Sequence, residues 1–186
     1  MNLQKLSKIR APKQLVENRI CFAGRESELS IYDTYDAAER VGLRSDQLLY
    51  CGMVTGKKVI HDDFHEAQQI FLPHESFVMA PGQYIAIDFP DALPDKPTTC
   101  ITVEISEERV RQVVEQMNET IPLDNGHREW DYKAAILHTH HTTATQQLLN
   151  RIVSLFIEDH PDRDFMIELC ITELIVRLLR HEEREF

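Results

Sequence analysis

The sequence predicts a mainly β protein that ends in a pair of helices, and three patterns lead to this prediction. Short runs of strand-forming residues alternate with turn signals between residues 20 and 105. After residue 105 the apolar residues recur at the spacing of a helix. Two more apolar helical stripes then occupy most of residues 143–186.

The predicted strands are short, and several of them end at Pro or Gly. The Pro81-Gly82 pair is a turn signal with a mechanism, because Pro presets φ and Gly accepts a positive φ. Seven or eight short strands separated by such turns are typical of a sandwich or a small barrel. The predicted strands cover residues 28–35, 46–54, 57–61, 69–72, 77–80, 84–89 and 99–105.

Helices are expected in the second half of the chain. Ser106 can cap a helix over residues 106–119, with two glutamates in its first turn, where the helix dipole favours anions. One more extended piece is expected at residues 132–138. A helix over residues 143–158 and a second over residues 164–180 follow, separated by His160-Pro161.

The last helix is apolar around more than one stripe, so it must be covered on more than one side. A second copy of the chain can provide this cover, because an extended apolar patch is typical of an interface. The alternative is a helix buried between its partner helix and the sheet of one monomer. The dimer interpretation assigns the interface to Leu148, Ile152, Phe156, Ile167, Ile171, Leu174 and Leu178.

Composition limits the class of protein. The 186 residues are 42% hydrophobic, which is enough for one ordinary core, and the formal net charge is −11. Such acidity argues against nucleic-acid binding by this chain, which needs a basic face. No apolar run reaches the length of a membrane span, and no signal peptide is recognisable. Four separated cysteines without a CxxC pair, in a chain without an export signal, indicate reduced thiols and a cytoplasmic protein. No dinucleotide fingerprint or phosphate loop is present, and we expect no cofactor.

Residues 1–19 form a basic arm. They contain five basic residues and one acidic residue, so the rest of the chain carries the acidic charge. Such an arm can dock on an acidic body, although a solvated, frayed terminus is the more common outcome.

Five stretches resemble, in this order, the N-terminal domain of AraC-family bacterial transcription regulators: residues 56–61 (GKKVIH), 72–81 (LPHESFVMAP), 87–92 (IDFPDA), 97–100 (PTTC) and 173–179 (ELIVRLL). The resemblance implies a cupin-like β-barrel (a double-stranded β-helix) that senses a small effector. It also implies a dimerising helix pair after the barrel. In such regulators a second domain with helix-turn-helix units binds DNA, and no basic recognition helix is present in this sequence.

The chain is therefore expected to divide into the arm (1–19), a barrel (20–142) and a helical hairpin (143–186). We expect an effector-sensing, homodimeric regulatory domain that is not an enzyme and contacts DNA only through a domain outside this chain. Two alternatives stay open: a small metal-dependent cupin enzyme, such as an isomerase or dioxygenase, and a bare dimerisation module with a filled barrel.

An effector is expected inside the barrel, since small barrels commonly hold one ligand. The candidates are residues unusual for a plain core: Tyr32, Tyr50, His61, Tyr84, Asp88, Thr102 and Glu104. Which strand faces line the barrel cannot be fixed, because a one-residue slip in register exchanges the two faces. The apolar faces, at residues 85, 87 and 89 and at residues 101, 103 and 105, could fill the barrel instead.

Two pairs of histidines, His61 with His65 and His138 with His140, are candidate metal ligands, and the sequence argues against both. An extended segment would separate His61 from His65 by about 13 Å, too far for one ion with bonds of about 2 Å. His138 and His140 share a strand face, but no carboxylate or cysteine lies nearby in the sequence to complete a set. Trp130, the single tryptophan, is expected to anchor a core or an interface.

Overall fold

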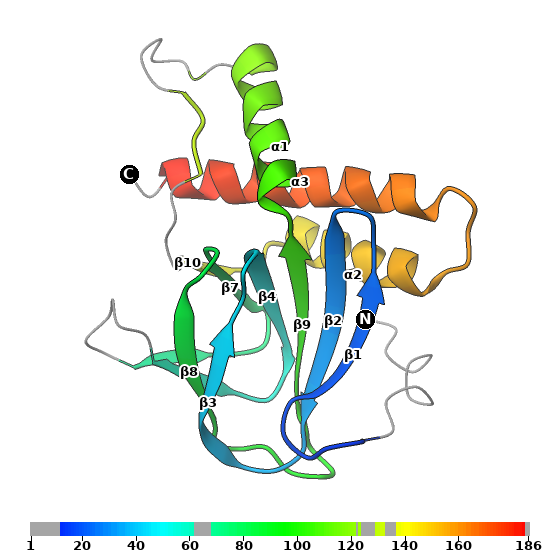
Figure 1. Ribbon diagram of the computed structural model, residues 1–186. Helices are drawn as coiled ribbons and strands as arrows, with labels where there is room; N and C mark the ends of the chain where they lie inside the picture. Colours follow the sequence, from blue (N-terminus) through cyan, green and yellow to red (C-terminus); the bar gives the residue numbers. More distant parts are fainter. Residues whose placement is uncertain (1–11, 62–67, 122, 124–128, 133–136, 185–186) are drawn as a thin grey trace.

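The computed structural model describes residues 12–61, 68–121, 123, 129–132 and 137–184. Within these residues, ten strands form two facing sheets that enclose a barrel, and three helices lie at one end of it (Figure 1). The prediction of a cupin-like barrel followed by helices is confirmed, although the strands at residues 18–23 and 38–44 were not among the expected ones.

Sheet A has the strand order β1-β2-β9-β4-β7-β10, and sheet B has the order β3-β8-β5-β6. All the paired strands run antiparallel. Sheet A contains β1 (Asn18–Ala23), β2 (Ser27–Thr34), β9 (Thr98–Ile105), β4 (Leu48–Thr55), β7 (Glu75–Met79) and β10 (Leu137–His140). Sheet B contains β3 (Ala38–Arg44), β8 (Tyr84–Phe89), β5 (Lys58–His61) and β6 (Gln69–Phe71).

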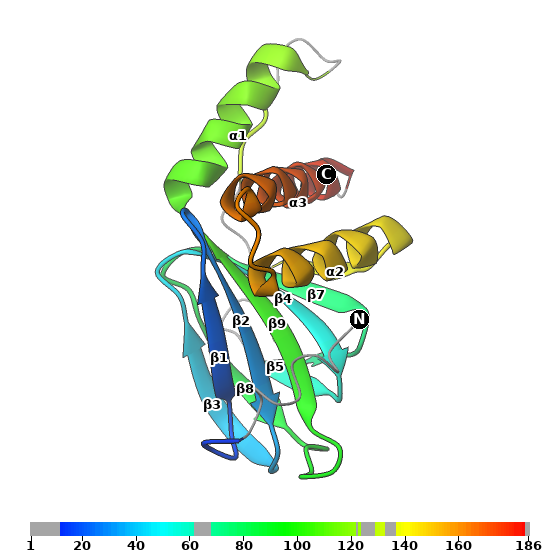
Figure 2. The ribbon, with the colours of Figure 1, turned by 90° about the vertical axis from the view of Figure 1, so that its right-hand side faces the viewer.

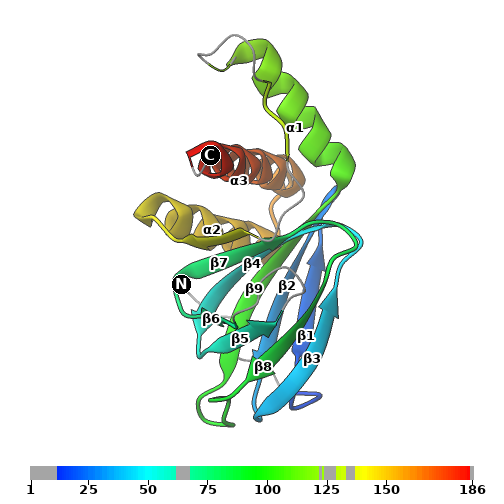
Figure 3. The same ribbon diagram turned by 90° about the vertical axis from the view of Figure 1, so that its left-hand side faces the viewer.

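The helices are α1 (Glu107–Thr120), α2 (Thr143–Ile157) and α3 (Arg163–Arg184). The Ser106 side chain accepts a hydrogen bond from the Arg109 amide, as expected of an N-cap. Figures 2 and 3 show α2 against sheet A, α3 above α2, and α1 rising beside α3. Trp130 is buried in this helical layer, and its Nε1 donates to the Ile121 carbonyl at 2.6 Å.

Two hydrophobic cores share sheet A as a common wall. One core fills the barrel, and the other lies between the outer face of sheet A and the three helices. The apolar face of β8 (residues 85, 87 and 89) points into the barrel. The apolar face of β9 (residues 101, 103 and 105) instead points to the helices. The idea that both apolar faces fill the barrel is therefore wrong for β9, whose polar face is the one that lines the interior.

The described part of the basic arm is attached to the end of β2. The Tyr35 amide donates to the Leu15 carbonyl at 2.6 Å, and the Glu17 amide donates to Thr34 Oγ1 at 3.1 Å. Asn18 and Arg19 belong to β1, so the barrel begins before residue 20. Residues 1–11 lie outside the described part of the chain. Among the described residues, none of the helices combines the length and the apolar character that a membrane crossing requires.

Candidate functional site: the polar face of β9 inside the barrel

The interior face of β9 carries polar side chains from one end of the barrel to the other. Cys100 belongs to the barrel core, and Thr102 and Glu104 share its side of the strand because side chains alternate. Tyr32 of β2 lies opposite Cys100 and packs on the same core. Three of the seven predicted ligand-binding residues, Tyr32, Thr102 and Glu104, are thus brought together. We call Cys100, Thr102 and Glu104 the β9 column.

Arg19 contacts several side chains near the Glu104 end of the column, which we call its upper end. Its guanidinium forms an ion pair with Glu28, lies 3.9 Å from Glu104, and donates through Nε to Ser30 Oγ at 3.0 Å. It also stacks over the Tyr32 ring at 5.7 Å. The carboxylates of Glu28 and Glu104 are about one-third exposed, so this end of the interior reaches solvent. Burial raises the pKa of Tyr32 to about 12, and its phenol therefore stays protonated and able to donate.

Thr102 occupies the middle of the column. It pairs with Ser30 on one side and with Cys51 on the other. Its side chain is 2% exposed, and its hydroxyl has no hydrogen-bond partner among the described residues. A buried hydroxyl without a partner costs about 1–3 kcal/mol, so this position is suited to a bound polar group.

Lys58 of β5, in sheet B, contacts the Cys100 end of the column, which we call its lower end. Its side chain is 3% exposed, and Nζ donates to Cys100 Sγ at 3.0 Å and lies 3.9 Å from Glu17 Oε1. Burial lowers the pKa of Lys58, but Cys100, Cys51 and Glu17 outweigh burial and raise it above its usual value. Lys58 therefore keeps a positive charge inside the barrel. Sequence reasoning missed this residue, although the alternation of Lys58 with the core residue Ile60 was a signal for it.

The other four predicted ligand-binding residues lie outside the barrel interior. Tyr50 is buried on the opposite face of sheet A, in the helical core, where it hydrogen-bonds Ser76 at 2.5 Å. His61, Tyr84 and Asp88 are on the outer face of sheet B. His61 Nε2 lies 2.7 Å from Asp88 Oδ2, and Tyr84 is 55% exposed. These residues do not join the β9 column, and assigning them to the same site is corrected here.

The His138–His140 pair does have a nearby carboxylate. It was missed because it comes from β7, which is distant in the sequence. Glu75 of β7 lies opposite β10 and contacts His138 Nε2 at 3.1 Å and His140 Nδ1 at 3.3 Å. Even so, no group of three or more His, Cys, Asp or Glu within the described residues is arranged to hold a metal ion. His65 lies outside the described part of the chain.

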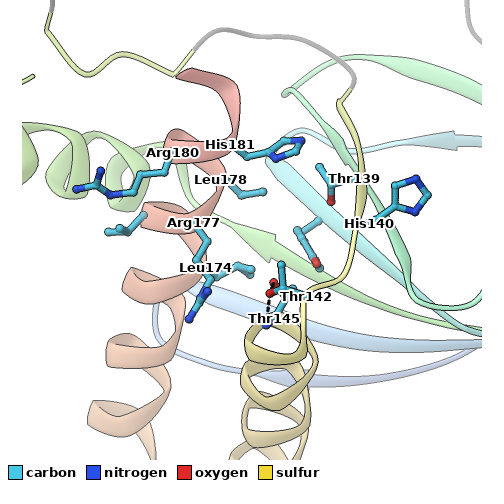
Figure 4. A pocket seen from close by; sticks show the side chains of 11 residues that line it. Thr139, His140, Thr142, Thr145, Leu174, Arg177, Leu178, Arg180 and His181 are labelled. Atoms are coloured by element: carbon cyan, nitrogen blue, oxygen red, sulfur yellow. Dashed lines mark hydrogen bonds between the residues drawn. The ribbon is translucent and has the colours of Figure 1, made fainter. Parts of the chain in front are cut away.

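Two hollows lie outside the barrel, against the helices. One, of about 220 Å³, is bounded by β10, the start of α2 and the end of α3 (Figure 4). Thr139 and Thr145 line it on one side, and Arg177 and Arg180 line it on the other. A second, of about 250 Å³, lies beside α2 between His74, His141 and Asn150. Both are alternatives to the barrel as a ligand site.

The seven predicted interface residues are all buried within one chain. Each is at most 6% exposed and packs in the core between sheet A and the helices, so none of Leu148, Ile152, Phe156, Ile167, Ile171, Leu174 and Leu178 is available to a partner. The apolar residues that α3 does expose are Phe165, at 69%, and Leu169, at 56%. The assignment of interface residues is corrected accordingly.

Comparisons with known proteins agree with this architecture. The family model described as AraC-type transcriptional regulator N-terminus matches residues 27–186. Among solved structures, apo ToxT K231A from Vibrio cholerae has a TM-score of 0.61 and 11% identity, covering 86% of this chain and 58% of that chain. No curated protein sequence matches.

Two further ToxT structures carry ligands. ToxT from Vibrio cholerae O395 bound to (E)-4-(8-methylnaphthalen-1-yl)but-3-enoic acid has a TM-score of 0.57 and 11% identity, covering 84% of this chain and 58% of that chain. Wild-type ToxT bound to an unsaturated fatty acid has a TM-score of 0.58 and 10% identity, covering 88% and 57%. This chain thus spans less than two thirds of the ToxT chains. By the match of the family model over most of its length, the chain belongs to the family of AraC-type transcriptional regulator N-termini.

Proposed function

We propose that this chain senses a small organic acid inside its barrel and passes the signal to the rest of a transcription regulator. The observation that carries the proposal is the buried, unpartnered hydroxyl of Thr102, held between the charged groups at the two ends of the β9 column. A ligand there would satisfy Thr102 and reach the cations Arg19 and Lys58.

The two cations favour a ligand with a carboxylate. Lys58 is a buried ammonium whose nearest acid, Glu17, is 3.9 Å away, so a ligand carboxylate could take the place of Glu17. The two ligands named for ToxT, a butenoic acid and a fatty acid, are both carboxylic acids. The mostly apolar barrel core, with Phe77, Met79 and Phe89, would hold the rest of such a molecule.

The signal would pass by linkage. A ligand that binds one barrel conformation better shifts the population toward it, and sheet A shares its wall with the helical core. Displacing Glu17 would also free the segment that precedes β1, since Glu17 belongs to that segment. We place DNA contact outside this acidic chain, and we place a regulator of this kind in the cytoplasm.

Ligand titration by calorimetry tests the proposal. Straight-chain carboxylic acids of increasing length should bind, and the primary alcohols of the same length should bind at least tenfold more weakly. Thr102→Val should weaken acid binding at least fivefold, since Val keeps the shape and removes the hydroxyl. It should also leave the unliganded protein as stable as before, or up to about 1 kcal/mol more stable.

Thr145→Val is the matched control, because Thr145 lines the outer hollow of Figure 4 and not the barrel. Loss of binding in Thr145→Val with full binding in Thr102→Val would move the ligand out of the barrel and overturn the proposal. The family favours a regulator over a small cupin enzyme. Stoichiometric iron, manganese or zinc in the purified protein would favour the enzyme.

A further inference from the structure

Two thiols and an ammonium group meet on the interior wall of the barrel. Lys58 Nζ lies 3.0 Å from Cys100 Sγ, and Cys51 belongs to the same barrel core as Cys100. Cys51 pairs with Thr102, whereas Cys100 pairs with Met53, so the two cysteines are diagonal neighbours on the same face of β4 and β9. None of the three side chains is more than 3% exposed.

The charge of this cluster favours a thiolate at Cys100. Lys58 is a buried ammonium, and the next acid is the Glu17 carboxylate at 3.9 Å. The neighbouring Cys51 and the ammonium of Lys58 lower the pKa of Cys100, whereas burial raises the pKa of Cys51. Besides Lys58, the titratable groups that face Cys100 are Cys51, Glu17 and Tyr32. Cys100 is therefore the sulfur favoured as a thiolate, and Cys51 beside it stays a neutral thiol.

Cys100 is 1% exposed, so a reagent reaches it only through local opening of the barrel. The nearest group that reaches solvent on the lower side is Glu17, whose side chain is 20% exposed. At the upper end, the partly exposed Glu104 lies four residues after Cys100 on the same face of β9.

We propose that Cys100 is an oxidation site for hydroperoxides and that Cys51 is its resolving thiol. The Cys100 thiolate attacks the outer peroxide oxygen, so that an S–O bond forms and the O–O bond breaks. The sulfur is oxidised by two electrons, and the peroxide is reduced to an alcohol or water, whose proton comes from the Lys58 ammonium. The Cys51 thiol then attacks the sulfenic sulfur, so that a disulfide forms and the Cys51 proton leaves with the sulfenic hydroxyl as water. Lys58 regains its proton from solvent.

The test compares the oxidation of the four cysteines in the folded chain. The reduced protein is treated with hydrogen peroxide for increasing times, then denatured and alkylated, and each cysteine is followed by peptide mass. Cys51 and Cys100 should lose alkylation together and appear as one disulfide-linked peptide pair. In Cys51→Ser, Cys100 should instead carry a sulfenic acid, which dimedone added on denaturation traps.

Two controls provide reference values for the oxidation rate of Cys100. Cys21 is exposed and serves as an internal reference, and Cys170→Ser removes a thiol outside the barrel. Lys58→Met should slow oxidation of Cys100 about tenfold, the change that one pKa unit gives in the thiolate population, while Cys21 keeps its rate. If Lys58→Met does not fold, the wild-type ratio of Cys100 to Cys21 oxidation decides. That ratio should rise as the pH falls from 9 to 6.5, and the rise should disappear in urea.

Cys100 that stays fully alkylatable after Cys21 is oxidised would overturn the proposal, as would a folded Lys58→Met protein that oxidises at the wild-type rate. Loss of acid binding in the Thr102→Val protein with unchanged oxidation would leave this inference standing, because the oxidation site does not depend on the proposed effector.

Discussion

Arg109 of α1 and Glu168 of α3 form an ion pair across the helical layer, with Nε and Oε2 separated by 3.2 Å. Arg109 also donates to the Glu168 carbonyl at 3.2 Å and to Thr172 Oγ1 at 2.5 Å. Burial raises the pKa of Glu168, although Arg109 opposes this shift. The pair is therefore the main polar connection that we find between α1 and α3 among the described residues.

Arg109→Met should destabilise the fold by about 2 kcal/mol, because it leaves a partly buried carboxylate without its cation. Glu168→Gln should cost less, since it removes the charge that needs compensation. Urea unfolding measures both. Arg111→Met is the control, because Arg111 pairs with Glu108 and Glu115 on the exposed side of α1 and should change little. Equal costs at Glu168 and Arg109 would contradict this explanation.

Gly56 should tolerate no side chain. Its φ is +82°, and a Cβ there would lie 2.3 Å from Thr98 Oγ1 and 2.7 Å from Thr98 Cα. Gly56→Ala should therefore cost about 3 kcal/mol or more, combining backbone strain with a clash. Gly82 is a matched control, since its φ is +79° but no atom lies within 4 Å of the added Cβ. Gly82→Ala should cost only about 1–2 kcal/mol in the same thermal unfolding experiment.

His141 should make the fold sensitive to acid. Burial lowers the pKa of His141 to about 4, with the neighbouring His74 adding to the effect. Because the folded-state pKa lies below the ordinary value of 6.5, the neutral ring is favoured in the fold. The contribution of His141 to stability should then be fully present above pH 6.5 and should be lost as the pH drops from 6.5 towards 4. The other groups around the ring are Tyr50, Ser76, Glu75 and His140.

Urea midpoints between pH 4 and 8 measure this effect. His141→Gln should flatten the decline below pH 6.5, because an amide can keep the contact with Ser76 without titrating. His160→Gln, at an exposed turn between α2 and α3, should leave the decline as in the wild type. An unchanged profile in His141→Gln would assign the acid sensitivity to other groups.

Phe165 and Leu169 should form part of a dimer contact. They lie one turn apart on α3 and are the large apolar side chains that this helix exposes among the described residues. Phe165→Glu and Leu169→Glu should convert a dimer to a monomer in sedimentation equilibrium, with a melting temperature that no longer depends on protein concentration. Ile70→Glu, at an equally exposed site on β6, should leave the dimer intact. A monomeric wild type would remove the dimer prediction altogether.

Local patterns predicted most of the fold correctly. The strand at Tyr84–Phe89, the cap at Ser106 and the helix beginning at Thr143 all coincide with the expected positions. These elements depend on alternation, capping chemistry and turn residues, which are local properties. Strand β3 was missed because it is an edge strand rich in exposed residues, and Arg40, with φ of +54°, interrupts its pairing.

The candidate site was only partly predictable, because it depends on which side of each strand faces the barrel. Thr102 and Tyr32 meet through the register of β2 and β9, which no single strand reveals. Tyr50 and Tyr32 look alike in sequence, yet they point to opposite cores. Lys58 was overlooked because a lysine in a short strand ordinarily faces solvent, and its burial depends on contacts with Cys100 and Glu17 that the strand alone does not show.

The shared wall of sheet A has a practical consequence for anyone who divides this molecule. Ile101 and Val103 belong to β9, yet their neighbours Ile152 and Ile171 come from α2 and α3. Truncation after residue 142 would remove α2 and α3 and expose much of the outer face of that strand and its neighbours to water. The barrel and the hairpin should therefore express and unfold as one cooperative unit, and neither piece should be soluble alone.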